Sequence, residues 1–482
     1  MRRLSGTGRF AIALAVAAAL LVPLVAVAAS RGDNDRSPSA APSFQRDVAP
    51  ILREKCIGCH QVGGIAPFSL QTAKQAQKWA QAIGAAVAAK VMPPWPPGPA
   101  SPDFVGQEDR QLTAEQRATI RAWAKAGGRA AGAGAGKPAA VKPDVRAGER
   151  LLSITMPSTY KPRAKGGVTD DYRCFLLDPQ LAEDSFATSA DIVPGARRIV
   201  HHVILFRLDA AGRAEARRVD QASPGPGWKC FGGPGVSGGG QLDNVPWISA
   251  WAPGREATRL PDGTGVDLPK GSLVVMQVHY NLLNGNAPDR SRVVFTLAPP
   301  TGLKPMETVL LPAPVELACT RGEKGRLCKR DAAVAELGKK YGTEASYAPI
   351  WLLALCGQPT TNPKPSTTST CNRKVTRPTT IHGVAGHMHL LGKSIRLELN
   401  PGTASARVLL DIPRWDFHWQ NSYTFEEAVE AKPGDVLRVT CKYDPARRRH
   451  GGHGIPQTPR YVLWGEGTTD EMCLGLLQVT RG

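Results

Sequence analysis

The chain has 482 residues, of which 42% are apolar and 21% charged, a composition that excludes wholesale disorder. Domains usually run to roughly 100–200 residues, so two or three folded units are expected. The net charge of +19 is scattered, and no basic run interleaved with aromatic residues indicates nucleic-acid binding. Glycine (50 residues) and proline (41 residues) are abundant while aromatic residues make up only 6%, which favours turn-rich β structure over a helical bundle.

The N-terminus has the pattern of a secretory signal peptide. Three arginines accompany an apolar stretch over residues 11–25, and Ala26, Val27 and Ala28 supply a small-residue cleavage site. We therefore expect residues 1–28 to be cleaved, residues 29–42 to form a polar leader, and the protein to be exported to a bacterial periplasm or outside the cell. The alternative is an uncleaved anchor, because the apolar stretch nearly reaches spanning length. No second apolar run of that length follows, so the mature chain is expected to have no stable membrane span.

Residues 43–129 predict a small helical unit. One helix is expected over about residues 72–90, and another begins after Thr113, whose side chain can cap it together with Gln116. Gly127 and Gly128 would end this second helix. Residues 130–147 are rich in alanine, glycine and proline, which is the composition of a linker.

The helical unit contains a CxxCH haem-attachment motif formed by Cys56, Cys59 and His60. Two thiols at this spacing can bond both vinyl groups of a haem, and the adjacent histidine then lies under the iron. A redox or zinc-binding CxxC is the alternative, but no other cysteine or histidine occurs before the linker, so zinc would lack ligands. Met92 is the only methionine between residues 43 and 129, and we expect it to be the second axial ligand of the iron. The unit resembles a class I cytochrome c, which carries electrons.

Beyond the linker the pattern changes to β-strands. Runs rich in β-branched residues or leucine are separated by turn residues, and they lie at residues 198–206, 273–282, 395–399, 436–443 and 472–479. The predicted fold is therefore multidomain, a small all-α cytochrome c domain followed by two mainly antiparallel β-sandwich domains. The sandwiches would cover residues 148–300 and 301–482, the second with a cysteine-containing insertion at about residues 319–377.

Five histidines fall in three segments of the β region, which points to metal binding. His201 and His202 are consecutive, so in a regular strand they face opposite ways and could meet one ion only at a bulge or a strand end. His279 lies in a second strand. His387 and His389 form an H-x-H pair, which projects both imidazoles to one side of a strand.

A methionine could decide which metal is bound, because a thioether selects copper over zinc. Met388 and Met276 face away from the neighbouring histidines, whereas Met472 begins a strand and could reach an ion. Taken alone, Met472 is more often a core residue than a ligand.

The β region resembles the copper type II monooxygenases, the family of the peptidylglycine and dopamine hydroxylases. The resemblance is spread in the family's order over about residues 148–482. It is carried by the segments that begin at residue 201 (HHVILF), 277 (QVHY), 386 (GHMHLLGK) and 469 (TDEMC), with shorter segments at 250 (AWAP) and 258 (TRLP).

The resemblance implies two coppers on two β-sandwich domains that face each other across a cleft. An electron-transfer copper would be held by His201, His202 and His279. A catalytic copper, which binds O₂ and attacks a substrate C–H bond, would be held by His387, His389 and Met472. All six ligand positions are present, so the expected function is an exported copper monooxygenase. The alternative is a haem–copper electron carrier or copper-binding protein without hydroxylase activity.

The likeness to peptidylglycine hydroxylases fails where those enzymes bind their substrate. They clasp the peptide carboxylate with an arginine, an asparagine and a tyrosine, and the matching positions here are Ala385, Leu474 and Leu476. A site without these polar groups would leave a carboxylate unpaired. We therefore expect a small, apolar, non-peptide substrate. The aromatic-amine substrate of the family is neither supported nor excluded by these positions.

Eight cysteines remain after haem attachment. The pairs Cys174–Cys230 and Cys441–Cys473 resemble disulfides of the family, whereas four others in the insertion allow three pairings. Residues 321–377 carry 11 basic and 4 acidic residues, a net charge of +7, which fits either a solvated, disulfide-stapled loop or a docking surface. The remaining histidines are expected to be structural or exposed: His382, His418, His450 and His453.

The haem and the coppers share one chain, which suggests how electrons arrive. A carrier on a short linker has an effective concentration of roughly millimolar at its target. We expect the haem to feed the electron-transfer copper, with a redox protein or an ascorbate-like reductant as the outside donor. A fused unit that serves only an outside partner is the alternative.

Overall fold

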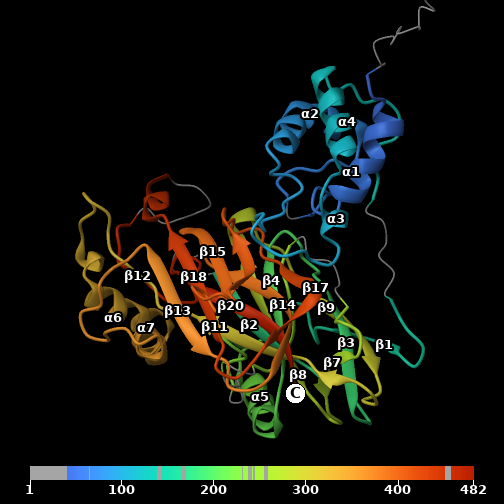
Figure 1. Ribbon diagram of the computed structural model, residues 1–482. Coiled ribbons are helices and arrows are strands. Elements are labelled where there is room, and N and C mark those ends of the chain that lie inside the picture. The colour runs from blue at the N-terminus through green and yellow to red at the C-terminus, as the bar shows by residue number, and fades with distance from the viewer. Residues whose placement is uncertain are drawn as a thin grey trace, which may run out of the picture. The chain divides into compact units, whose positions relative to one another are not determined.

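The computed structural model describes residues 41–64, 66–137, 144–163, 170–230, 232–236, 242, 245–253, 259–450 and 458–482 (Figure 1). The expected signal peptide, most of the polar leader and residues 138–143 of the expected linker lie outside the described residues. Within the described residues, no helix is long and apolar enough to cross a membrane.

The first described segment is helical, and its helices begin where the sequence places their caps. Its elements are η1 (Phe44–Val48), α1 (Ala49–Lys55), α2 (Ala73–Ala88), α3 (Gln107–Arg110) and α4 (Ala114–Lys125). Thr72 and Thr113 each cap a helix in a reciprocal capping box, with Gln75 and Gln116 respectively. Apolar residues of α1, α2 and α4 pack on a small core that contains Leu52, Ala80, Ile120 and Trp123.

The expected fold class is nevertheless wrong. The described chain is mostly β-strand, arranged in five sheets, and no all-α cytochrome c domain is separated from them. Residues 42–482 form one compact unit. The physical reason lies in the segment before α3, because Phe104 forms a β-bridge with Phe425 and is buried in the core of the last strands. The amide of Gly98 also donates to the carbonyl of Asp411 at 2.7 Å.

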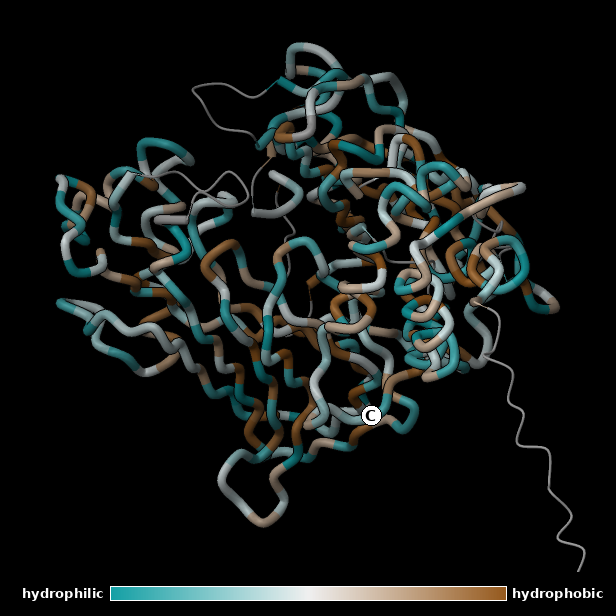
Figure 2. Tube along the Cα trace, turned by 90° about the horizontal axis from the view of Figure 1, so that it is seen from above, coloured by the Kyte–Doolittle hydropathy of each residue, from teal (hydrophilic) through white to brown (hydrophobic). Residues whose placement is uncertain are grey.

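The strands that follow form two five-stranded sheets that share one core. One sheet has the order β1-β9-β3-β7-β10 and the other β5-β2-β8-β4-β6. Phe175, Val278 and Phe295 are buried between them, and Figure 2 shows apolar, brown segments gathered among the strands. The strands are β1 (Arg150–Thr155), β2 (Asp170–Leu177), β3 (Ser185–Val193), β4 (Val200–Arg207), β5 (Trp228–Lys229), β6 (Trp247–Trp251), β7 (Thr264–Leu268), β8 (Val274–Asn281), β9 (Arg292–Ala298) and β10 (Lys304–Pro305), with α5 (Ala210–Ala222) after β4 and η2 (Leu282–Asn284) after β8.

The last third of the chain builds a second core in the same way. Two four-stranded sheets, β11-β20-β14-β17 and β13-β18-β15-β16, bury Val384, Leu397, Val439 and Leu477. A short β12-β19 pair completes this part. Its strands are β11 (Glu307–Pro312), β12 (Glu316–Leu317), β13 (Thr368–Lys374), β14 (Thr379–His387), β15 (Gly392–Leu399), β16 (Arg407–Ile412), β17 (Ser422–Ala431), β18 (Val436–Tyr443), β19 (Val462–Leu463) and β20 (Leu474–Arg481).

Helices appear in this part chiefly in the insertion. They are η3 (Arg326–Cys328), α6 (Arg330–Tyr341) and α7 (Thr343–Leu355), and η4 (Pro445–His450) follows β18.

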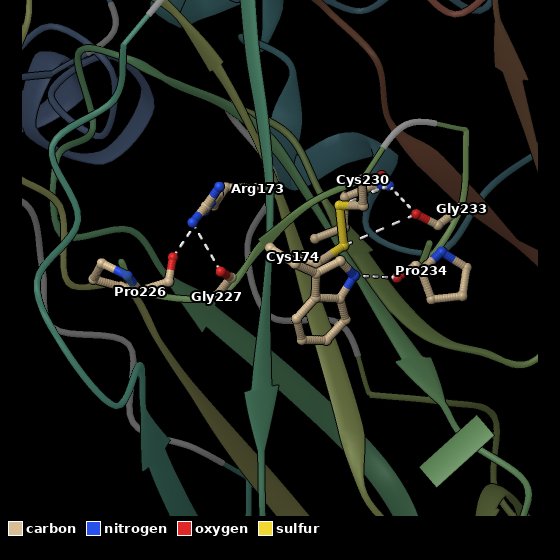
Figure 3. Close-up of a disulfide and its surroundings, with 9 residues drawn as sticks. Arg173, Cys174, Pro226, Gly227, Cys230, Gly233 and Pro234 are labelled. Atoms are coloured by element: carbon tan, nitrogen blue, oxygen red, sulfur yellow. Dashed lines mark hydrogen bonds between the residues drawn. A yellow bond between two sulfur atoms is a disulfide. The ribbon is translucent and has the colours of Figure 1, made fainter. Parts of the chain in front are cut away.

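Four disulfides hold the β region. Cys174–Cys230 and Cys441–Cys473 are the pairs that the family resemblance implies. The insertion contains the other two, Cys319–Cys328 and Cys356–Cys371. Figure 3 shows how the first disulfide is supported, since Arg173, next to Cys174 on β2, donates to the carbonyls of Pro226 and Gly227, each at 2.8 Å. Disulfides of this number are typical of exported or secreted proteins.

Candidate functional site

A bulge in β4 brings two consecutive histidines to the same place. The register of β4 against β8 shifts between Val200 and His202, so His201 and His202 do not point to opposite faces as they would in a regular strand. His279 of β8 lies directly opposite His202 in this register. The local sequence therefore meets the condition under which both histidines can bind one ion.

The three imidazoles converge through the same ring nitrogen. The Nδ1 atoms of His201 and His202 are 3.4 Å apart, and the Nδ1 atoms of His202 and His279 are 3.3 Å apart. Two nitrogens that each lie about 2 Å from one ion must be less than about 4 Å apart. The spacing therefore fits a three-histidine metal site. One ligand nitrogen from each of the three rings lies close enough to the others for all three to bind one ion.

Neighbouring side chains fix the orientation of these rings. The Nε2 atom of His279 is 2.9 Å from Oδ1 of Asp170, an acceptor that makes Nε2 the protonated nitrogen and leaves Nδ1 for a metal. The ring of Tyr172 stacks on His279 with a centroid distance of 4.2 Å. Asp170 also accepts from the hydroxyl of Thr468 at 2.9 Å, which ties this site to the loop before β20.

The H-x-H pair lies at the end of β14, with its rings turned the other way. His387 Nδ1 is hydrogen-bonded to Oε1 of Gln420, and His389 Nδ1 is 3.2 Å from the carbonyl oxygen of Asp470. Both Nδ1 atoms are thus engaged outside the site, which leaves Nε2 of each ring as the ligand atom. The two ring centroids are 5.0 Å apart.

Glu471 joins the H-x-H pair to Met472. Its carboxyl oxygens accept from the backbone amides of His389 at 3.0 Å, Leu391 at 2.5 Å and Met472 at 3.1 Å. Burial raises the pKa of Glu471 to about 8. The residue is fully buried, so it acts as a rigid internal bracket rather than as a surface charge.

Met472 itself is buried and is held from its other side. Its carbonyl accepts from the hydroxyl of Tyr443 at 3.1 Å, and the next residue, Cys473, is disulfide-bonded to Cys441 on β18. Because Met472 and both histidines of the pair line the same cavity, a thioether and two imidazoles face one space.

That cavity is shared by both histidine sites. Its volume is about 310 Å³, and His202 lines it together with His387, His389 and Met472. Most of the remaining wall is apolar and comes from residues of both cores and from α7: Trp247, Trp251, Leu310, Pro312, Ala348, Trp351, Leu352, Ala385, Leu474 and Leu476.

The loop between β16 and β17, residues 413–421, contacts both sites and was not singled out by sequence reasoning. Phe417 stacks on His201 with a centroid distance of 4.6 Å and meets His389 edge-on at 6.1 Å. Trp415 donates its Nε1–H to the carbonyl of His389 at 3.1 Å. His418 lies with its ring centroid 6.4 Å from that of His201. The run of aromatic residues in this loop is the signal that could have drawn attention to it.

Burial keeps the imidazoles of His201, His202, His387 and His389 neutral at neutral pH. It lowers the pKa of His201 and His202 well below the usual value, that of His387 to about 4 and that of His389 to about 3. Metal ligation requires the neutral ring, so no proton has to leave these side chains when an ion binds. Side chains with strongly shifted pKa values are also expected to cluster at functional sites.

The haem-attachment motif lies between α1 and α2. The four disulfides use the other eight cysteines, so Cys56 and Cys59 remain as thiols. Nδ1 of His60 is 3.2 Å from the carbonyl oxygen of Phe68, which leaves Nε2 for an iron ion. Met92 is partly buried in the loop after α2.

The other histidines differ in how far they are described. His382 is hydrogen-bonded to Thr480 at 2.8 Å and lies away from the cavity wall. The side chain of His450 and the whole of His453 lie outside the described residues.

A family model and a known protein both match parts of this chain. The copper type II ascorbate-dependent monooxygenase C-terminal domain matches residues 354–478. A tyramine beta-hydroxylase of Caenorhabditis briggsae is 25% identical over 350 residues, which cover 68% of this chain and 48% of that protein. The chain thus spans about half the length of this relative.

Likeness to solved structures is weak. The major capsid protein P2 of bacteriophage PM2 is 8% identical, with 69% of this chain and 97% of that chain covered and a TM-score of 0.23. An allantoicase is 10% identical, with 69% and 90% covered and a TM-score of 0.16. TM-scores this low do not establish a shared fold. Over these regions the chain is similar to copper type II ascorbate-dependent monooxygenases, and the family match covers His387, His389 and Met472.

Proposed function

We propose that this protein is a two-copper monooxygenase that inserts one atom of O₂ into a C–H bond of a small apolar molecule. The other oxygen atom leaves as water, with two electrons and two protons from a reductant. The observation that carries the proposal is the shared cavity, which is lined by His202 of the first site and by His387, His389 and Met472 of the second. The relative's name, tyramine beta-hydroxylase, supports hydroxylation as the reaction type.

The residues of the two sites fit different tasks. His201, His202 and His279 offer three nitrogens and would hold the electron-transfer copper. His387, His389 and Met472 offer two nitrogens and a soft sulfur, which favours cuprous copper, and would hold the copper that reacts with O₂. When bound, the two coppers would supply one-electron chemistry, and the protein contributes a largely apolar cavity and fixed ligand orientations.

The wall of the cavity supports an apolar substrate. Ala385, Leu474 and Leu476 all line it, at the positions where a peptidylglycine hydroxylase would bind a carboxylate. Ala385 lies opposite Leu476 in the β14–β20 ladder, and His387 lies opposite Leu474, so the apolar side chains stand beside the proposed catalytic ligands. A buried carboxylate would find no cationic partner among these three residues.

We also propose that a covalent haem at Cys56 and Cys59, with His60 and Met92 as axial ligands, supplies electrons to the first copper. The two thiols and the outward hydrogen bond of His60 support attachment there. Export, with cleavage of residues 1–28, would suit haem attachment outside the cytoplasm. The outside donor would be a redox protein or an ascorbate-like reductant.

Metal content and oxygen consumption test the main proposal. Purified protein should contain two coppers, and reductant-dependent O₂ consumption should rise when a suitable apolar substrate is added. Met472→Ala should abolish this rise while the first copper and any haem remain, because it removes one thioether from one site. If copper content and turnover were both unchanged in the variant, Met472 would be a core residue and no ligand. Failure across a broad apolar panel with both coppers present would favour the electron-carrier alternative.

Leu476→Arg tests the substrate class. The added guanidinium in the cavity wall should cost apolar turnover at least about tenfold, because it must be desolvated or exclude the substrate. Leu476→Met, which keeps the wall apolar, is the matched control and should retain turnover. Turnover of a carboxylate-bearing substrate by the unchanged protein would contradict the apolar assignment.

Stopped-flow mixing tests the role of the haem. Prereduced haem should reoxidise as cupric protein is reduced, without ascorbate, at a rate independent of protein concentration. A rate that rises linearly with concentration would show transfer between molecules and would contradict internal supply.

A further inference from the structure

The helix α7 carries an exposed apolar stripe along one face. Tyr347 is 63% exposed, Ile350 38%, Trp351 50% and Leu355 36%, and their spacing of three, four and eight residues from Tyr347 places all four on one side of the helix. Elsewhere in the described residues, the exposed large apolar side chains are valines and leucines without an aromatic residue among them: Val62, Val91, Val105, Val145, Leu151 and Leu283.

The opposite face of α7 is apolar as well. Pro349, Leu352 and Leu353 are buried, and Leu352 belongs to the core of the last strands. A helix that is apolar all round is normally buried on all sides or lies in a membrane, yet only half of α7 is covered. With 13 residues it is too short to cross a bilayer. The stripe formed by Tyr347, Ile350, Trp351 and Leu355, here the α7 stripe, therefore lacks an apolar partner among the described residues.

The stripe is held rigidly. Cys356, directly after α7, is disulfide-bonded to Cys371 on β13, and Cys319–Cys328 closes the segment before α6. Helices α6 and α7 pack side by side (Figure 1). A fixed apolar face of this kind loses little conformational freedom when a partner covers it.

The charge around α7 points to the kind of partner. Residues 321–377 carry 11 basic and 4 acidic residues. Lys339 and Lys340 end α6 just before α7 begins. Basic residues beside an apolar face that contains tryptophan and tyrosine are the composition of a helix that lies in the interface of an anionic bilayer. A protein partner that buried this face would meet the same positive charge, but it would not need an aromatic residue at the boundary.

The α7 stripe is continuous with the cavity. Trp351 is half exposed and also lines the cavity, as do Ala348 and Leu352 of the same helix. A surface that covered the stripe would therefore lie at the edge of the apolar wall beside Met472.

We propose that the α7 stripe docks this protein on an anionic lipid bilayer, from which the cavity takes an apolar, membrane-dissolved substrate. The docking stands apart from the proposed oxygenation, whereas the delivery of substrate rests on it. Insertion is shallow, with the apolar side chains among the acyl chains and the net positive charge of residues 321–377 attracted to the anionic headgroups.

Vesicle co-sedimentation of the full chain tests the docking. The unchanged protein should bind vesicles that contain phosphatidylglycerol, bind phosphatidylcholine vesicles much more weakly, and lose affinity as ionic strength rises. Tyr347→Ser/Ile350→Ser should weaken binding at least about tenfold, because two of four interfacial side chains are lost. The control Val105→Ser/Leu151→Ser removes two apolar side chains of similar exposure elsewhere and should leave binding unchanged.

Three results would overturn the docking proposal. The first is equal vesicle binding by the stripe variant and the control variant. The second is equal binding of the unchanged protein to both kinds of vesicle. The third is no vesicle binding by the unchanged protein together with a dimer that the stripe variant abolishes, which would make a second copy of the chain the partner. Oxygen consumption separates the two proposals. The stripe variant should keep turnover of a water-soluble apolar substrate and lose turnover of one dissolved in vesicles. A protein that binds vesicles but consumes no O₂ with any substrate would sink the oxygenase proposal and leave the docking intact.

Discussion

The two histidine sites use the same side chain in opposite orientations. In the first site the imidazoles meet through Nδ1, and the Nε2 of His279 is bonded outward to Asp170. In the second site the Nδ1 atoms of His387 and His389 are bonded outward, so Nε2 faces the cavity. The hydrogen-bond partner of each ring therefore decides which ring nitrogen remains for a metal. These partners, Asp170 in the first site and Gln420 and Asp470 in the second, do not belong to the proposed ligand sets.

The two sites also differ in backbone geometry. The first site needs a β-bulge between Val200 and His202, because consecutive residues of a strand face apart. The second site needs no bulge, since residues two apart point to the same side, but it needs an added residue, Met472, from the segment before β20. Glu471 provides that connection, because its carboxyl accepts hydrogen bonds from the backbone amides of His389 and of Met472. Among its described contacts, the first site has no buried carboxyl that accepts from the amides of two of its ligands.

Glu471→Ala should break the second site and have the largest effect. It leaves the buried amides of His389, Leu391 and Met472 without their acceptor, and each unpaired donor costs about 1–3 kcal/mol. We expect the free energy of unfolding to fall by about 3 kcal/mol or more, with the second copper lost and the first kept. Urea unfolding and copper analysis measure the two effects. Glu466→Ala is the matched control, because Glu466 lies on the same loop and accepts none of these amides; equal losses in both variants would contradict the bracket.

Asp170→Asn should weaken only the first site. The amide oxygen can still accept a hydrogen bond, but the negative charge behind Nε2 of His279 is gone, and loss of such a partner typically lowers metal affinity about 10–100-fold. Titration of copper against a competing chelator should show this loss at one of the two sites. Asp171→Asn is the control, since the neighbouring carboxylate accepts from Tyr160 and from the amide of Arg163 and contacts no site histidine. An equal loss in both variants would mean that net charge, and no specific contact, sets the affinity.

Local structure could be predicted from the sequence where the cause is local. The capping box at Thr113 and the strands that carry His201, His202 and His279 follow from spacing and residue type. The same reasoning states the condition for His201 and His202 to meet, and the structure provides the bulge. Two of the four disulfides could be expected from the family resemblance.

Long-range contacts could not be predicted in this way. The composition change after residue 129 suggested a separate helical domain, but the bridge between Phe104 and Phe425 joins residues more than 300 positions apart, which no local pattern encodes. Phe417 stacks on His201 across more than 200 positions, so its place between the two sites depends on how the two cores meet. The pairing of Cys356 with Cys371 depends on the path of the chain between α7 and β13, which the spacing of the cysteines alone does not define.

Arg259→Gln should separate stability from metal binding in the first part of the chain, with the smallest effect. Arg259 forms a two-pronged ion pair with Glu149, with Nη1 2.9 Å from Oε2, and lies away from the histidines. The hydrogen bond from Arg259 lowers the pKa of Glu149 to about 2. A carboxyl whose folded pKa is depressed stabilises the fold above its unfolded pKa, and this contribution is lost as the pH falls through the folded value.

The expected result follows from that sign. At pH 7 the variant should be roughly 1 kcal/mol less stable in urea, because a partly exposed charge-assisted pair is lost. The difference from the unchanged protein should shrink as the pH falls from about 4.5 towards 2, where Glu149 becomes protonated even beside Arg259. Copper content at pH 7 should stay the same, since neither ion-pair partner contacts a site histidine. A stability difference that stayed constant down to pH 2 would mean that Arg259 acts through packing, and loss of the first copper at pH 7 would mean that general destabilisation alone can empty that site.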